Sequence, residues 1–182
     1  MKPTKKLFTL VEILTVAAII AILAGISVGV LGLISNKNAE AKTQATIKAL
    51  ELALGQFKTE NGHVYVPTGA SLNTPSLLTV PTTLPSNLNG TLLKYLDQKL
   101  LSSASVVSGA NRYFVDGWGR PLIYRMPGKF NKTGFDLGSV GADGKVGDAQ
   151  GSEVTASALP SASNYESCFG QGDDITNFLR PN

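Results

Sequence analysis

The stretch FTLVEILTVAAIIAILAGISVGVLGLI, residues 8–34, decides the fold of this chain. It carries a single charge, Glu12, and is otherwise almost wholly apolar. As a helix it would be about 40 Å long, which is enough to cross a bilayer. Helices in soluble cores are rarely apolar on every side over such a length. A secretory signal has an apolar segment of only about 7–15 residues. The stretch therefore predicts a helix that spans a membrane.

A short basic leader, residues 1–7, precedes this stretch and contains Lys2, Lys5 and Lys6. The chain has 16 basic and 13 acidic residues, a net charge of +3. Without the three leader lysines the two signs balance, so the excess charge belongs to the leader and gives no reason to expect nucleic-acid binding. Lysines before a first membrane span mark its cytoplasmic side. We therefore expect the remainder of the chain to lie outside the cytoplasm.

The helical pattern continues after the apolar stretch, but residues 35–62 are amphipathic. Apolar residues recur there at intervals of three and four, which places them on one face of a helix: Ile47, Leu50, Leu54 and Phe57. The Asn61–Gly62 pair is a typical helix stop. We expect one helix from about Phe8 to Asn61, whose second half packs this stripe against the C-terminal domain.

Residues 63–182 are predicted to form a globular domain. Four prolines between residues 65 and 96 exclude a long helix there, so we expect a surface loop with one short helix near Leu92–Leu96. Strands are predicted at 113–115 and 122–124, separated by a turn at Asp116–Gly117, and again from Phe135. From Gly138 onward a loop is predicted, GSVGADGKVGD followed by a Ser/Ala-rich stretch to Asn164. The fold class is α+β: a long N-terminal helix on a small antiparallel sheet, with a loop-rich C-terminus.

The segment 136–174 is strongly acidic, with Lys145 as its only base. Its acidic residues are Asp136, Asp143, Asp148, Glu153, Glu166, Asp173 and Asp174. Carboxylates together with free backbone carbonyls are the ligands that Ca²⁺ prefers. The alternative is a solvated acidic loop in which Asp residues form turns. The spacing does not match an EF-hand, and composition alone leaves both interpretations open.

Residues typical of catalysis are scarce. His63, the only histidine, lies beside the predicted helix end, and Cys168, the only cysteine, cannot form an internal disulfide. The sequence contains no phosphate-binding loop and no serine-nucleophile motif. We therefore expect a protein that is not an enzyme.

Four segments resemble a known family: FTLVE after the basic leader, WGRPLIYR (118–125), FDLGSVGADGKVG (135–147) and DDITNF (173–178). The first is similar to the start of type IV pilins and pseudopilins. The others look like the major pseudopilin of type II secretion systems. The resemblance implies a structural subunit of a pseudopilus that serves protein export. A type IV pilus or minor pilin subunit, or a membrane-tethered binding module, are the alternatives.

The resemblance also implies how such a chain is processed and assembled. A prepilin peptidase would cut between Leu7 and Phe8 and methylate the new amine, although the family usually has Gly where Leu7 stands. Residues 8–34 would anchor the chain in the bacterial inner membrane as a single span, with the C-terminal domain in the periplasm. An inner-membrane assembly platform would draw copies into a homo-oligomeric fibre together with minor pseudopilins. Glu12 would pair with the N-terminal amine of a neighbouring subunit.

In the major pseudopilin, a loop carboxylate and a later Asp pair bind calcium together with backbone carbonyls. By match, the resemblance implies a calcium site made by Asp143, Asp173 and Asp174 with the Val140 carbonyl. Between Gly147 and Asp173 this chain carries about 25 residues that are not matched by the family's compact loop.

Overall fold

The computed structural model describes residues 9–83, 90–147 and 153–178, and within the first helix it leaves out the side chains of residues 26–31 and 33. The chain divides into two units, residues 1–37 and residues 38–182. Each unit is described by itself.

Helix α1 (Leu10–Asn61) begins in the first unit and ends in the second. At its start, the backbone N–H of Glu12 donates to the Thr9 hydroxyl, and the Thr9 N–H donates to the Glu12 carboxylate. This reciprocal pair is a capping box, which satisfies two backbone donors that the first turn leaves without helical partners. At the other end Gly62 has a φ of 75°, so the predicted stop is confirmed. The predicted continuous helix is confirmed over the residues described.

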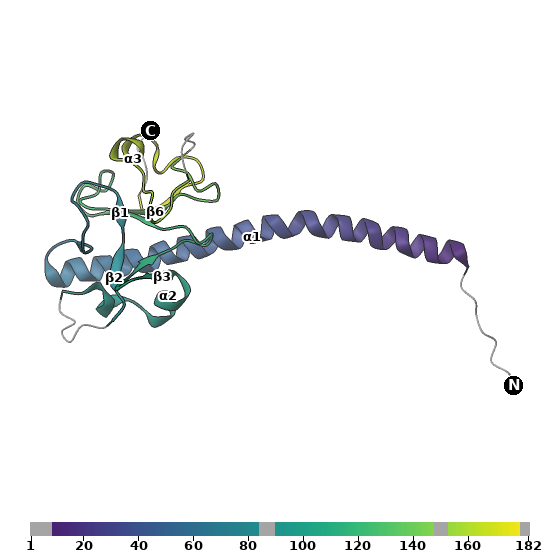
Figure 1. Ribbon diagram of the computed structural model, residues 1–182, viewed down its shortest axis with the longest axis horizontal. Coiled ribbons are helices and arrows are strands. Elements are labelled where there is room, and N and C mark those ends of the chain that lie inside the picture. The colour runs from purple at the N-terminus through teal and green to yellow at the C-terminus, as the bar shows by residue number, and fades with distance from the viewer. Residues whose placement is uncertain (1–8, 84–89, 148–152, 179–182) are drawn as a thin grey trace. The chain divides into compact units, whose positions relative to one another are not determined.

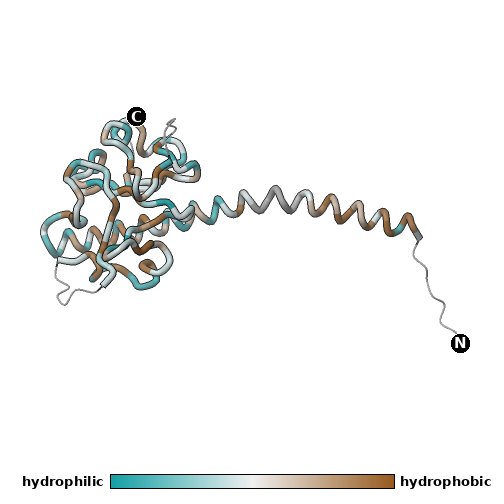
Figure 2. Tube along the Cα trace, in the orientation of Figure 1, coloured by the Kyte–Doolittle hydropathy of each residue, from teal (hydrophilic) through white to brown (hydrophobic). Residues whose placement is uncertain are grey.

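The first unit exposes large apolar side chains around the helix. Among the described side chains of this unit, ten are at least half exposed: Leu10, Val11, Ile13, Leu14, Val16, Ile19, Ile20, Ile22, Leu23 and Ile34. Figure 2 shows these first turns as continuously hydrophobic, whereas hydrophilic residues are interspersed in the part of α1 that belongs to the second unit.

A search of the described residues for a helix both long enough and apolar enough to cross a membrane found none. The predicted span, residues 8–34, includes Phe8 and the side chains of residues 26–31 and 33, which lie outside that description.

The second unit contains two antiparallel sheets (Figure 1). One has the order β1 (Ser76–Leu77), β5 (Ile123–Arg125), β6 (Asp136–Ser139), β7 (Ile175–Thr176), and the other β2 (Thr79–Pro81), β4 (Asn111–Phe114), β3 (Ser105–Ser108). The α+β class is confirmed, and so are the three predicted strands. The strands on either side of the Asp116–Gly117 turn belong to different sheets, because β4 pairs with β2 and β3 while β5 pairs with β1 and β6.

Three short helices complete the described part of the unit. The 3₁₀ helix η1 (Leu92–Tyr95) lies where the sequence predicts it. Helix α2 (Gln98–Ser103) is capped by Asp97, and helix α3 (Ala162–Cys168) by Ser161. The prediction of loop throughout the region around α3 is wrong, because the Ser161 cap and buried Tyr165 supply what a low-propensity segment lacks. Likewise, the predicted 65–96 loop contains β1 and β2.

The hydrophobic core has two parts. In the first, the predicted α1 stripe packs against residues of both sheets: Ile47, Leu50, Leu54 and Phe57 with Val80, Phe114, Tyr124 and Leu137. The second part contains Ile123, Val140 and Val146 packed against Val154, Tyr165 and Phe169. Residues that follow the 136–147 region in the chain therefore cover it, and this second core supports the acidic loop.

Candidate functional site

The acidic loop, residues 140–147, follows β6 and lies beside the Asp173–Asp174 pair. The pairing of β6 with β7 brings them together, because Ser139 is opposite Ile175 and Gly138 opposite Thr176. Two Asp residues immediately before β7 therefore face the residues immediately after β6. The structure thus brings the backbone of Asp143 into contact with Asp173, although Asp173 and Asp174 follow Asp143 by 30 and 31 positions in the chain.

Asp173 holds the beginning of this loop. Its Oδ2 accepts hydrogen bonds from the backbone N–H groups of Ala142, at 2.6 Å, and Asp143, at 3.1 Å. Gly141 has a φ of 67°, and a Cβ at this position would collide with the Asp173 carboxylate. Glycine is required here both by the backbone conformation and by the close approach of Asp173.

Asp174 holds the end of the loop and a second turn. Its Oδ2 accepts the backbone N–H of Gly147, at 2.9 Å, and of Gly170, at 2.8 Å. Its Oδ1 is buried and has no hydrogen-bond partner among the described residues. Burial raises the pKa of Asp174 to about 7; the two N–H groups lower it, and nearby Asp173 and Asp143 raise it further. The Asp174 carboxyl thus takes up a proton near neutral pH.

The other two predicted ligands have different environments. The Asp143 side chain is exposed, and its Oδ1 accepts the N–H of Lys145 at 2.8 Å. The Val140 side chain is fully buried in the second core, which positions its backbone at the base of the loop. Within the described ranges, no three His, Cys, Asp or Glu side chains are grouped so that they could hold a metal ion.

Arg120 also holds the loop, a contact that was not predicted from the sequence. Its Nη1 donates to the Gly141 carbonyl at 3.2 Å, and its Nε pairs with Glu153 at 3.3 Å. A Cβ on Gly144 would collide with this guanidinium, and Gly144 has a φ of 76°. The WGRPLIYR motif contains Arg120, but no pattern along the chain indicates that this side chain reaches a carbonyl 21 residues away.

Basic residues from outside segment 136–174 pair with some of its acids, so Lys145 is not the only base near them. Arg125 and Lys129 both pair with Glu166, at 2.9 and 3.0 Å. Asp136 is buried and accepts hydrogen bonds from three backbone N–H groups and the Tyr165 hydroxyl. Asp148 lies outside the described residues. Among the described acids of segment 136–174, those not compensated in this way are Asp143 in the acidic loop and the adjacent residues Asp173 and Asp174.

The predicted processing and assembly residues lie in the first unit. Leu7 and Phe8 are outside the described residues. Glu12 is exposed and contributes to the capping box with Thr9. A local role for its carboxylate therefore exists besides the pairing that the resemblance implies.

Comparison with known proteins identifies the family. The family model described as type II secretion system (T2SS), protein G matches residues 33–157. Three relatives named type II secretion system core protein G are similar to the chain. They come from Pseudomonas aeruginosa (34% identical over 143 residues), Aeromonas hydrophila (33% over 143) and Escherichia coli (34% over 142). Each alignment covers 77% of this chain and 83–85% of the relative.

The search of solved structures returned no match. The family match includes Val140 and Asp143 and ends before Asp173 and Asp174. It nevertheless covers more than half of the chain, and the relatives agree with it over most of their length. The chain therefore belongs to the type II secretion system protein G family.

Proposed function

We propose that this chain is the major structural subunit of a type II secretion pseudopilus, anchored in the inner membrane before it is assembled into a periplasmic fibre. Membership of the protein G family supports the proposal. The observation that carries it is the first unit of the structure, where a helix exposes large apolar side chains around its surface. Such a surface is stable only in lipid or against other apolar helices. A subunit that moves from a membrane into a helix-packed fibre uses both environments.

Glu12 is the residue through which assembly can be tested. In the fibre, its carboxylate would pair with the N-terminal amine of a neighbouring subunit, because an unpaired charge among apolar helices is costly. The capping box offers a competing local role. Glu12→Gln separates the two, since Gln also serves in a capping box but carries no charge.

The experiment measures fibre yield and membrane insertion of Glu12→Gln in cells that express the secretion machinery. We expect normal insertion and a fibre yield at least tenfold below that of the unmodified chain. Glu40→Gln, at a half-buried position of α1 beyond the apolar stretch, is the control and should assemble normally. Normal fibres from Glu12→Gln would contradict the pairing with the N-terminal amine and leave the helix cap as the role of Glu12.

Processing is proposed to occur between Leu7 and Phe8. Mass spectrometry of the chain from its native membrane should show N-methylated Phe8 as the first residue. Leu7→Gly should accelerate the cleavage, because the family usually has Gly at this position. A membrane-bound chain that retains Met1 throughout would contradict the proposal.

A calcium ion is proposed to bind at the acidic loop, held by Asp143, Asp173 and Asp174 with backbone carbonyls that include Val140. The chemistry of the donors supports this: hard oxygen ligands, three neighbouring negative charges, and a buried Asp174 Oδ1 without a partner among the described residues. When bound, the cation would offset the negative charge of Asp143, Asp173 and Asp174. Arg120 and Asp173 both hold the loop backbone.

A further inference from the structure

No contact within this chain requires a glycine at position 55 of helix α1. It is in the helix interior, where Gly is less stable than Ala because its backbone is more flexible when unfolded. Its φ is not in the left-handed region, and a Cβ added there would meet nothing within 4 Å. Neither backbone conformation nor internal packing therefore explains the glycine, so a contact with another molecule is the remaining explanation.

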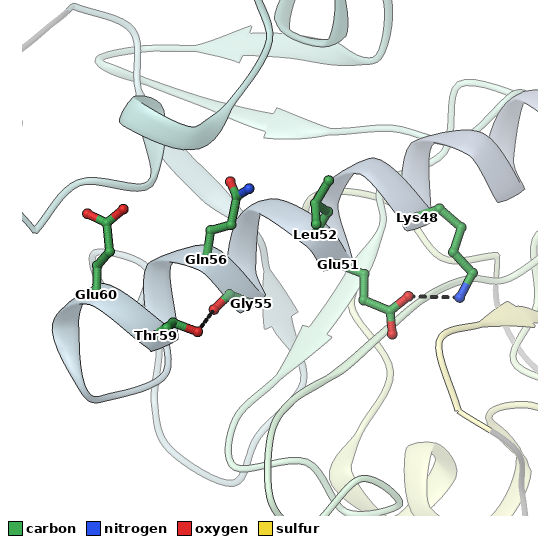
Figure 3. A pocket seen from close by; sticks show the side chains of 7 residues that line it. All are labelled: Lys48, Glu51, Leu52, Gly55, Gln56, Thr59 and Glu60. Atoms are coloured by element: carbon green, nitrogen blue, oxygen red, sulfur yellow. Dashed lines mark hydrogen bonds and ion pairs between the residues drawn. The ribbon is translucent and has the colours of Figure 1, made fainter.

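Gly55 lies in a shallow, open groove on the outer face of α1, which is lined only by residues 48–60 of this helix (Figure 3). Leu52, one turn away, is 64% exposed, although the opposite stripe of the helix is buried. Figure 3 shows Leu52, Gln56 and Glu60 pointing to the same side of the helix, and the Thr59 hydroxyl bonded to the Gly55 carbonyl. The helix thus presents an exposed leucine beside a position without a side chain.

The charges around this groove are already paired within the chain. Lys48 pairs with Glu51 at 2.9 Å, and Glu60 pairs with Lys94 at 2.6 Å. The groove therefore has no net charge to offer a partner. An uncharged apolar segment is the complementary ligand, because it brings no charge that the groove would leave unpaired.

One described segment of the same chain has this character. Outside α1, four large apolar residues of the described ranges are exposed, namely Val66, Leu72, Val106 and Val107. Only Val106 and Val107, 41% and 61% exposed, are consecutive. They lie on β3, the edge strand of its sheet, within the uncharged run ASVVSGA, residues 104–110. Since neighbouring strand residues point to opposite faces, neither face of this edge is covered.

We propose that β3 of one subunit docks into the Leu52–Gly55 groove of the next subunit in the fibre. This inference rests on the proposed function, because a fibre of identical copies requires contacts between two different patches. A contact of this kind repeats without closing and so extends a filament. The missing side chain at Gly55 allows the β3 edge to approach the helix closely.

Disulfide cross-linking tests the contact directly. In the full-length chain with Cys168→Ser, Leu52→Cys and Val107→Cys are combined, and fibres are assembled by the secretion machinery and then oxidised. A disulfide needs Cα atoms within about 7 Å, so we expect a ladder of covalent oligomers on a non-reducing gel. Each single variant should give at most dimers, and a Leu52→Cys, Leu72→Cys pair should give no ladder.

Gly55 variants provide an independent measurement. Gly55→Ala and Gly55→Leu should leave the melting temperature of the unassembled chain unchanged or higher, because the added atoms meet open space. Only Gly55→Leu, which fills the groove, should lower the fibre yield, by tenfold or more. Fibres without a ladder, or normal assembly of Gly55→Leu, would overturn the docking contact. Absence of fibres from the cysteine-free parent would instead overturn the proposed function, and the contact with it.

Discussion

The two ends of strand β6 are each organised by a carboxylate that accepts backbone N–H groups, but only one of these arrangements is complete. Asp136 begins the strand and is fully buried. Both of its oxygens are used, by the N–H groups of Lys129, Phe130 and Asn131 and by the Tyr165 hydroxyl. This carboxylate anchors the turn that precedes β6 and ties it to α3.

At the other end of β6, the carboxylate of Asp174 also accepts backbone N–H groups of the acidic loop, but it has fewer donors than Asp136. Asp174 receives two N–H groups on Oδ2 and, within the described residues, none on its buried Oδ1. The difference teaches that a buried carboxylate is a structural anchor when donors surround it. Where donors are missing, burial favours the protonated form of the carboxyl. Four predictions test this contrast, in order of decreasing effect.

Asp136→Ala should destabilise the fold most. It leaves three backbone donors and a tyrosine hydroxyl without their acceptor in the interior, so we expect a loss of at least about 4 kcal/mol in the free energy of unfolding. Urea denaturation of the full-length chain in detergent measures it. The control is Asp97→Ala, which removes only the α2 cap and should cost about 1 kcal/mol. Equal losses in the two variants would disprove the anchoring role of Asp136.

Calcium should stabilise the acidic loop. A ligand that binds only the folded chain adds about 2.7 kcal/mol at one hundred times its Kd. We therefore expect the melting temperature to rise with calcium and fall with a chelator. Asp143→Ala and Asp173→Ala should lose this response, whereas Asp97→Ala should keep it. A chelator without effect on the unmodified chain would leave a solvated acidic loop as the explanation.

The protonation of Asp174 predicts a pH dependence in the presence of a chelator. Its pKa is about 7 in the fold against 3.8 for a free Asp, so between these values the folded chain binds one proton more than the unfolded chain. Stability should therefore fall as pH rises from about 4 to about 7, by roughly 1–2 kcal/mol since the group is partly exposed.

Asp174→Asn should flatten that slope. Glu166, whose pKa is lowered by its bonds to Lys129 and Arg125, acts in the opposite direction, because its contribution is lost as pH falls through its folded pKa, below 4.5. Melting curves between pH 5 and 8 therefore isolate Asp174 from Glu166. A slope that survives in Asp174→Asn would assign it to another group.

Tyr165→Phe should have the smallest effect. It removes one of four donors from Asp136, whose backbone donors remain, and we expect a loss of about 1 kcal/mol. Tyr95→Phe removes a hydroxyl bonded to exposed Glu60 and should change stability by less than about 0.5 kcal/mol. If Tyr165→Phe destabilised the chain as much as Asp136→Ala, the tyrosine would be the principal anchor of the turn.

Local patterns were sufficient for much of the fold. The three- and four-residue spacing of Ile47, Leu50, Leu54 and Phe57 predicted the buried face of α1 correctly. The Asn61–Gly62 stop and the strand segments were also predictable, because each depends on neighbours in the sequence. Helix α3 was not, since its stability comes from Tyr165 and Phe169 in the second core, which only long-range packing creates.

The candidate site divides in the same way. The sequence by itself determined the excess of acids in segment 136–174 and the motif by which Asp143, Asp173 and Asp174 were selected. Only the tertiary structure decided which acids stay uncompensated: Glu153 and Glu166 pair with Arg120 and with Arg125 and Lys129, which come from outside the segment. The physical reason is that charges interact through space. The β6–β7 pairing and the second core set those distances, and no spacing along the chain encodes them.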